Sequence, residues 1–133
     1  MTICRRLWRH WRWIMAYHFY IMGDADKITQ VLCNLIGNAI NYTGADKKII
    51  VRQSLHEHHV RVDVIDSGEG IAAQDIPYVW DRYYKGDKAR KRLVSGTGLG
   101  LSIVQKILEL HGATYGVESK PGMGADFWFA FEI

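Results

Sequence analysis

The stretch VRVDVIDSGEGI, residues 60–71, joins a strand pattern directly to a glycine-rich turn. Alternate residues of a strand point to the same face, and the apolar face here carries Val60, Val62 and Val64. Arg61 and Asp63 point to the other face. The strand ends at Asp66, whose carboxylate could accept a hydrogen bond from the amino group of an adenine or could equally cap its own turn. The sequence therefore predicts a sheet strand that delivers a carboxylate to a tight turn.

A second glycine cluster, GTGLGL at residues 96–101, directly precedes a helical pattern. Glycines at alternate positions permit positive φ and let the backbone approach a ligand closely. A glycine-rich loop that leads into a helix also points backbone N–H groups and the positive end of the helix dipole at one spot, which suits phosphate. The cluster is neither a P-loop nor a Rossmann fingerprint, which would follow a first strand. Taken singly, either glycine cluster could also be a tight turn.

The segment 28–40 predicts an amphipathic helix with asparagines along one edge. Its apolar residues have the i, i+3, i+4, i+7 spacing of a helix with one buried face: Ile28, Val31, Leu32, Leu35, Ile36, Ala39 and Ile40. Asp24 is the expected N-cap, and Thr43 and Gly44 are expected to end the helix. Three asparagines lie within about 60° of one another on the helix surface: Asn34, Asn38 and Asn41. These amides could bind a ligand or could cap neighbouring backbone groups.

The rest of the chain alternates between helix and strand patterns. The predicted strands are residues 48–55, 60–65, 113–119 and 125–133, and the further predicted helices are 76–82 and 101–110. Short polar turns join the paired strands, as in antiparallel hairpins. This order predicts an α/β (α+β) two-layer sandwich, with a mixed, mostly antiparallel sheet and helices on one face.

Composition separates the first 22 of the 133 residues from the rest. They contain four arginines and no acidic residue, whereas residues 23–133 hold 13 Lys and Arg against 14 Asp and Glu. We expect this basic, aromatic leader to be non-native to the domain, or to touch a membrane or a partner. Because the body is nearly neutral, nucleic-acid binding is not expected. Two cysteines cannot form a disulfide framework, so we expect a cytoplasmic protein.

A polar stretch between the glycine clusters, residues 84–95, carries five cations: Lys85, Lys88, Arg90, Lys91 and Arg92. A loop of this length between helices is usually functional or disordered. It could be a solvated charged face. Beside a phosphate-type glycine loop, it is better explained as a mobile cationic lid.

Four boxes in this order resemble the catalytic ATP-binding domain of bacterial sensor histidine kinases. They are NLIGNA at 34–39, DSGEG at 66–70, the aromatic-basic stretch that begins at Trp80, and GTGLGL at 96–101. The resemblance covers residues 23–133 and places the domain among the Bergerat-fold ATPases, which include DNA gyrase. It implies a sheet with helices on one face and ATP between the helix layer and the lid.

The resemblance implies a role for each matching residue. Asn38 would coordinate the Mg²⁺ that bridges the ATP phosphates, and Asn34 would line the same edge. Asp66 would bind the adenine amino group, and Arg82 or Lys85 would reach the terminal phosphate, so that Asn38, Arg82 and Lys85 are the expected catalytic residues. The other expected contacts with ATP are Tyr42, Gly68, Gly70, Ile71, Tyr83, Tyr84, Gly96, Thr97, Gly98, Leu99, Gly100 and Leu101.

The sequence departs from the pattern of this family at several places. Asn41 stands where many relatives have a phosphate-facing lysine, and the closing motif at 122–127 lacks the usual hydroxyl residue. His10 and His18 lack the acidic neighbour of a phospho-accepting histidine. We therefore expect an excised domain that does not autophosphorylate alone.

As a whole, the resemblance implies a domain that binds Mg-ATP and donates the γ-phosphoryl group to a histidine on a separate dimerisation domain, in a relay that ends at a response regulator. The parent would be a membrane-anchored homodimer and this fragment a monomer. An alternative is an interaction module that responds to ATP or ADP without transfer, or a serine kinase of the anti-sigma type. The long lid and its aromatic-basic box favour the sensor kinase.

Overall fold

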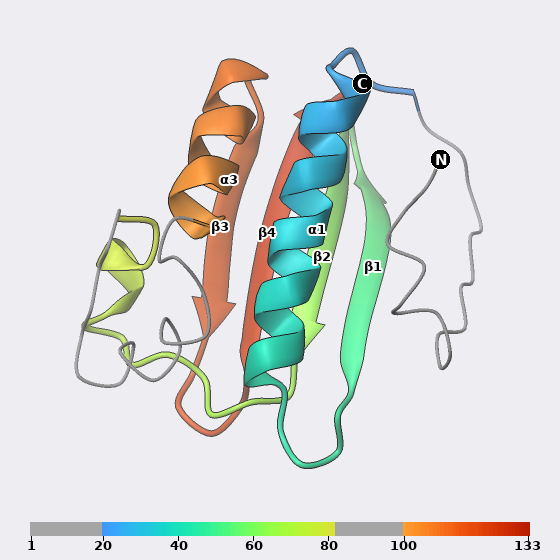
Figure 1. Cartoon of the computed structure of the whole chain (residues 1–133). Coiled ribbons are helices and arrows are strands. Elements are labelled where there is room, and N and C mark those ends of the chain that lie inside the picture. The colour runs from blue at the N-terminus through green and yellow to red at the C-terminus, as the bar shows by residue number, and fades with distance from the viewer. Residues whose placement is uncertain (1–19, 82–99) are drawn as a thin grey trace.

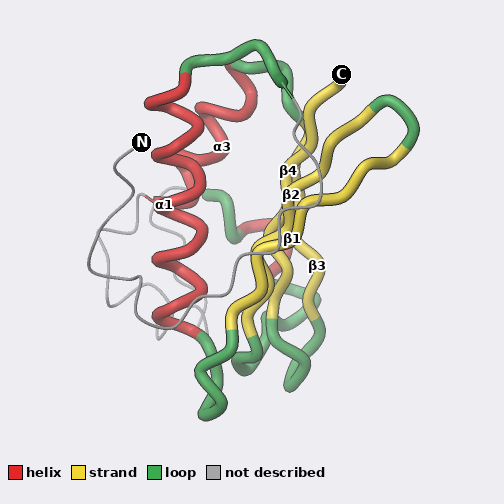
Figure 2. The backbone as a smooth tube through the Cα atoms, turned by 90° about the vertical axis from the view of Figure 1, so that its right-hand side faces the viewer, coloured by secondary structure: helices red, strands yellow, loops and turns green. Residues whose placement is uncertain are grey.

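The computed structural model describes residues 20–81 and 100–133, and these form two layers, a sheet with two helices packed on one of its faces (Figures 1 and 2). In chain order the elements are α1 (Ala25–Tyr42), β1 (Ile49–His56), β2 (His59–Asp66), the 3₁₀ helix η2 (Ile76–Tyr78), α3 (Gly100–Leu110), β3 (Thr114–Ser119) and β4 (Ala125–Glu132). The predicted two-layer sandwich is confirmed.

The helix α1 begins and ends as its sequence predicts. Asp24 Oδ1 accepts hydrogen bonds from the backbone N–H groups of Asp26 and Lys27, at 2.9 and 3.1 Å, so Asp24 is the N-cap. Thr43 is the C-cap, and its N–H donates to the carbonyl of Ala39. The face of α1 that packs on the sheet buries Val31, Leu35 and Ala39.

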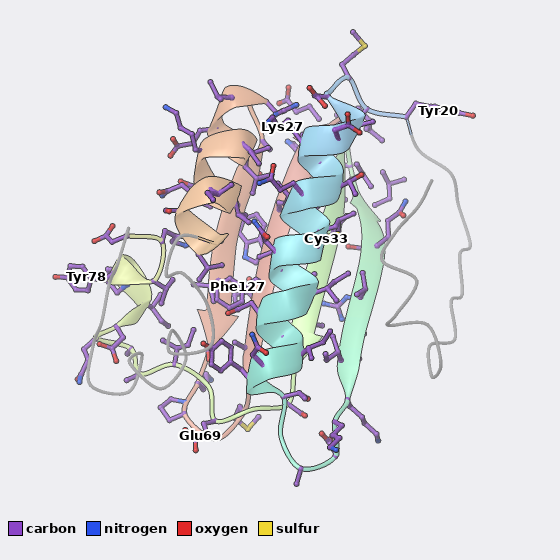
Figure 3. The ribbon with its side chains drawn as sticks, in the orientation of Figure 1. Tyr20, Lys27, Cys33, Glu69, Tyr78 and Phe127 are labelled. Carbon is purple, nitrogen blue, oxygen red and sulfur yellow. The ribbon has the colours of Figure 1, made fainter. Side chains whose placement is uncertain are left out.

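The sheet has the strand order β1-β2-β4-β3, and each of its three pairings is antiparallel. No parallel pair occurs among the described strands, although a mixed sheet was expected. Val64 of β2 lies opposite Phe127 of β4, and Val62 lies opposite Phe129. These side chains point toward the helices, and the core between the layers also contains Val104, Ile107 and Leu108 of α3. Phe127 is part of this core, and Figure 3 labels it between the ribbons of α1 and α3.

The predicted helix at 76–82 is shorter in the structure. Within the described residues 76–81, only Ile76–Tyr78 are helical, and they form a 3₁₀ turn with i→i+3 bonds, such as Val79 N–H to the carbonyl of Ile76. Pro77 stands in the first turn, where its missing N–H is tolerated. Trp80 then turns into the core, where its ring contacts Tyr115 and Phe127 edge-on, with centroids 5.0 and 5.5 Å apart. Among the described helices, none is long and apolar enough to cross a membrane.

Candidate functional site

Asp66 is the last residue of β2 and is buried, with 3% of its surface exposed. Its Oδ1 atom accepts a hydrogen bond from the backbone N–H of Gly68 at 2.9 Å. The carboxylate therefore does cap its own turn, one of the two roles that the sequence left open. The sheet holds the backbone of Asp66, and this hydrogen bond holds one oxygen of its carboxylate. Together they fix the direction of the side chain.

Gly68 brings the turn after β2 against the end of α1. A Cβ atom at Gly68 would lie 1.8 Å from the carbonyl oxygen of Tyr42, the last residue of α1. No side chain fits there. The glycine was predicted to let the backbone approach a ligand closely, and in the structure it lets the turn after β2 approach the end of α1. The structure thus brings together Tyr42, Asp66 and Gly68, three of the predicted ATP contacts.

Gly70 and Gly124 lock the same turn against the β3–β4 hairpin. Both have positive φ, +77° and +73°. A Cβ at Gly70 would lie 2.2 Å from the carbonyl oxygen of Lys120, and a Cβ at Gly124 would lie 2.0 Å from that of Asp66. The carbonyl of Glu69, which Figure 3 places at this end of the molecule, accepts a hydrogen bond of 2.6 Å from Gly122 N–H.

Ser119 completes this contact with a side chain that the sequence did not single out. Its Oγ accepts a hydrogen bond from the N–H of Ile71 at 2.8 Å and donates one to the carbonyl of Gly124 at 2.6 Å. The last residue of β3 therefore joins the predicted adenine turn to the β3–β4 turn. The hairpin belongs to the site, and the glycines at 122 and 124 were the available signal for it.

Ser67 ties the turn to the loop between α1 and β1. Its Oγ donates to a carboxylate oxygen of Asp46, accepts from the N–H of Gly44 at 3.2 Å and lies 3.1 Å from Thr43 Oγ1. The hydrogen bond from Ser67 lowers the pKa of the exposed Asp46 carboxyl, with a smaller contribution from the Lys48 backbone. These bonds attach the turn that follows Asp66 to a third segment, the loop between α1 and β1.

The asparagine edge of α1 lies next to the beginning of α3. Asn34 Nδ2 donates a long hydrogen bond of 3.5 Å to the carbonyl of Gly100, the first residue of α3. The Asn38 side chain, one turn further along, is half-buried and makes no hydrogen bond with the described parts of the chain. The two amides therefore differ: Asn34 joins the two helices, whereas Asn38 has no hydrogen-bond partner among the described residues.

Eight of the predicted site residues lie outside the described residues: Arg82, Tyr83, Tyr84, Lys85, Gly96, Thr97, Gly98 and Leu99. The described ones gather at the end of the helix layer where α1 stops and α3 starts. A hollow of about 500 Å³ lies around the turn of the β3–β4 hairpin, and its lining includes Ser119, Gly124 and Asp126. It contains none of the predicted ATP contacts, so we do not identify it with the predicted site.

Known proteins resemble this chain over most of its length. Residues 23–133 match the family described as histidine kinase-, DNA gyrase B-, and HSP90-like ATPase. The chain is 39% identical over 112 residues to the sensor histidine kinase WalK of Bacillus subtilis, which covers 83% of this chain and 18% of WalK. It is 37% identical over 110 residues to the sensor-like histidine kinase SenX3 of Mycobacterium tuberculosis, covering 83% of this chain and 27% of SenX3.

Solved structures give the same result. The nucleotide-free catalytic domain of the histidine kinase ThkA superposes with a TM-score of 0.69 at 33% identity, over 83% of this chain and 68% of that one. Full-length ShkA in complex with AMPPNP superposes with a TM-score of 0.65 at 29% identity, over 78% of this chain and 21% of ShkA. The chain spans about a quarter or less of the length of WalK and SenX3.

Proposed function

The chain belongs to the histidine kinase-, DNA gyrase B- and HSP90-like ATPases as an ATP-binding catalytic domain of the histidine kinase type, and from this premise we propose that it binds Mg-ATP and donates the γ-phosphoryl group to a histidine on a separate dimerisation domain. The observation that carries the proposal is the buried carboxylate of Asp66 in a turn that three other segments hold rigid. Positioning is what such a transfer demands most of a protein.

The adenine end of the site is built around Asp66. A buried carboxylate that accepts a hydrogen bond from an exocyclic amino group discriminates strongly, because a base with a carbonyl at that position would place two acceptors against each other. Gly68, Gly70 and Ile71 supply the backbone beside the base, and Tyr42 lies next to Gly68. ATP is therefore the substrate, and GTP is disfavoured.

The phosphate end of the site lies along α1 toward α3. Asn38 offers a neutral amide oxygen, which suits Mg²⁺ because this ion keeps several waters and takes further oxygens from phosphates. The ion would neutralise charge that builds up on the transferring phosphoryl group. Gly100 and Leu101 begin α3, whose N–H groups point toward the same end of the site. We assign Gly96, Thr97, Gly98 and Leu99 to the triphosphate, Tyr83 and Tyr84 to the nucleotide, and Arg82 and Lys85 to the terminal phosphate from their sequence positions.

The wider setting follows from the same family. The acceptor histidine would belong to the dimerisation domain of a parent kinase, and the phosphoryl group would pass on to a response regulator. We propose a parent that is a membrane-anchored homodimer with this domain in the cytoplasm, a monomer when isolated. Residues 1–22 would be a leader outside the domain.

Substitution of Asn38 tests the proposal directly. Asn38→Ala should abolish transfer of labelled phosphate from ATP to a separately supplied dimerisation domain of a sensor kinase such as WalK. It should also remove the Mg²⁺ dependence of ATP binding, measured by calorimetry, because the ion loses its protein ligand. Melting should change by only a few degrees, since the side chain is outside the core.

Gln30→Ala is the matched control, because it removes an exposed amide from the same helix two turns earlier. This variant should transfer phosphate at the parent rate. Transfer by Asn38→Ala close to that rate, with an unchanged magnesium requirement, would show that Asn38 does not hold the ion.

A further inference from the structure

His111, just after the end of α3, holds the start of α1. Its Nε2 atom lies 3.0 Å from the backbone N of Asp24, a residue 87 positions earlier in the chain. Its Nδ1 atom lies 2.8 Å from the carbonyl oxygen of Ile107, one turn back in α3. Figure 1 shows the end of α3 beside the beginning of α1, at the opposite end of the helix layer from Tyr42. No proposed ATP contact involves this histidine.

The two partners determine the protonation of the imidazole ring. A backbone N–H can only donate, so Nε2 must accept from Asp24 and carries no proton. A carbonyl oxygen can only accept, so Nδ1 must donate to Ile107 and carries the proton. His111 is therefore neutral and in the Nδ1–H tautomer wherever both contacts exist.

The Cδ2–Nε2 edge of the ring also lies close to Gly23, the residue that precedes the N-cap. A Cβ at Gly23 would lie 3.0 Å from Cδ2 of His111, closer than nearly all real Cβ contacts. Behind the ring, the Ala113 N–H donates to the carbonyl of Leu108 at 3.0 Å and Gly112 has a φ of +66°, so a closed C-terminal turn fixes the position of His111. The imidazole thus contacts the chain where it enters the domain, and the family match starts at residue 23 as well.

The other end of α3 lies at the proposed phosphate site. Gly100 accepts the bond from Asn34 there, and between the two ends Val104 and Leu108 are fully buried against α1 and the sheet. The helix has 11 residues, so it spans about 16 Å as one rigid rod. A shift at its first turn would be transmitted to His111, because a close-packed interior transmits strain.

We propose that His111 is a positioning residue, which as a neutral Nδ1–H imidazole ties the point where the chain enters the domain to the helix that begins at the phosphate site. This contact orients the domain relative to the segment that precedes it in a parent kinase. The part of the proposal that concerns nucleotide rests on the proposed function. The contact between His111 and Asp24 does not.

Two substitutions separate the two ring contacts. Asn can place a side-chain N–H near the position of Nδ1 but has no acceptor near that of Nε2, whereas Gln can place an oxygen near Nε2. We expect His111→Asn to speed exchange of the Asp24 backbone amide roughly three- to tenfold, since one hydrogen bond is lost, and His111→Gln to leave it within about twofold. Exchange is measured by NMR on the 133-residue chain, with the Lys27 amide, which donates to Asp24 Oδ1, as an internal control.

Equal exchange at Asp24 in the parent and in both variants would overturn the proposal. If the asparagine variant does not fold, the ¹⁵N spectrum of the parent imidazole decides the question. Protonated Nδ1 and unprotonated Nε2 are expected. The reverse tautomer would overturn the assignment.

A non-hydrolysable ATP analogue provides the second arm. It should slow exchange of the Asp24 amide further in the parent and in His111→Gln but not in His111→Asn, while all three chains bind it within about twofold by calorimetry. Binding without any change at Asp24 would overturn the link between the two ends of α3. Absence of binding to the parent would overturn the proposed function instead, and the nucleotide-free measurements would still decide the role of His111.

Discussion

Asp63 and Asp66 lie three residues apart on β2, and both carboxylates are buried, with 1% and 3% of their surface exposed. They point to opposite faces of the sheet. Asp66 faces the helix layer and accepts a hydrogen bond from the backbone of Gly68. Asp63 faces away from the helices and pairs with two arginines, Arg61 at 2.8 Å and Arg52 at 3.5 Å.

The neighbours of Asp63 form a charge cluster on the open face of the sheet. The guanidinium group of Arg61 lies 4.3 Å from the ring centre of Trp128 and also reaches the carboxylates of Glu118 and Asp126, at 3.3 and 3.8 Å. Burial, and then the nearby charge of Asp63, raise the pKa of Asp126 to about 6. One oxygen each of Asp63 and Asp126 is buried without a hydrogen bond in the described structure.

The contrast shows that burial of a carboxylate does not by itself identify a binding site. On the open face, cations from the same and the neighbouring strand neutralise the charge, which is the arrangement of a structural ion pair. On the helix face, the carboxylate precedes a turn whose backbone contacts three other segments, and we propose that this fixed position serves recognition of the base. Substitutions that change one face should therefore affect stability, and those that change the other should affect ATP binding.

Removal of the Arg61 charge should have the largest effect. Arg61→Met keeps much of the side-chain volume but leaves Asp63 and Asp126 buried beside each other with only the longer contacts of the exposed Arg52, at 3.5 and 4.0 Å. We expect the free energy of unfolding at pH 7 to fall by about 3–5 kcal/mol, measured by urea denaturation. ATP affinity of the folded protein should stay within about twofold.

Arg52→Met is the matched control, because this side chain is 56% exposed and pairs with Asp63 at a longer distance. It should lower stability by at most about 1 kcal/mol. Equal losses from the two substitutions would show that the open face is not organised around Arg61.

Local patterns in the sequence explain why most of the fold could be predicted. The spacing at 28–40 falls inside α1, and the strands at 48–55 and 60–65 match β1 and β2 within a residue or so. Helix and strand periods are local properties, and so is the N-cap at Asp24. The 3₁₀ turn at Ile76–Tyr78 was extended too far, because a short apolar run after a proline does not distinguish an α-helix from a tighter turn.

Contacts between distant segments could not be predicted in this way. Asp63 was placed correctly on the outer face, yet its burial depends on Trp128 and Asp126, which reach it only through the register of β2 with β4. The contact of Gly70 with Lys120 and the bond from Asp24 to His111 depend on the tertiary structure in the same way. Within the site, the sequence identified residues that a ligand would touch and missed Ser119, which holds them in place.

The second prediction applies one chemical change to both faces. Asp66→Asn places an amide opposite the adenine amino group, and we expect ATP affinity to fall by about 1.5–3 kcal/mol, the range for a hydrogen bond to a charged group. Asp66→Ala should behave alike. In the parent protein, GTP should bind much more weakly than ATP. Calorimetry at fixed magnesium concentration measures both effects.

Asp63→Asn is the control from the other face. It should lower stability, while the folded protein keeps its ATP affinity within about twofold. Circular dichroism before the titration verifies that the variant is folded. Equal ATP and GTP affinity in the parent, or an equal loss of affinity in the two variants, would contradict the assignment of Asp66 to adenine.

The smallest effect is expected at Asp126, and it should depend on pH. Since burial and Asp63 raise the pKa of Asp126 from 3.8 to about 6 in the folded protein, the folded state holds this proton more tightly than the unfolded state. The resulting stability is fully present below pH 4 and is lost as the pH rises toward and through 6.

Asp126→Asn removes the titration. The full shift, which already includes the attraction of Arg61, corresponds to about 3 kcal/mol. Because burial of the polar amide also costs free energy, we expect a net stabilisation of about 1 kcal/mol at pH 7.5. The difference from the parent in the free energy of unfolding should therefore grow between pH 4 and 6.5 and level off above it. Glu118→Gln is the control, because it removes an exposed carboxylate that contacts the same arginine. A difference that is constant from pH 4 to 8 would mean that Asp126 is ionised throughout, and a constant destabilisation would mean that Arg61 and Arg52 outweigh its burial.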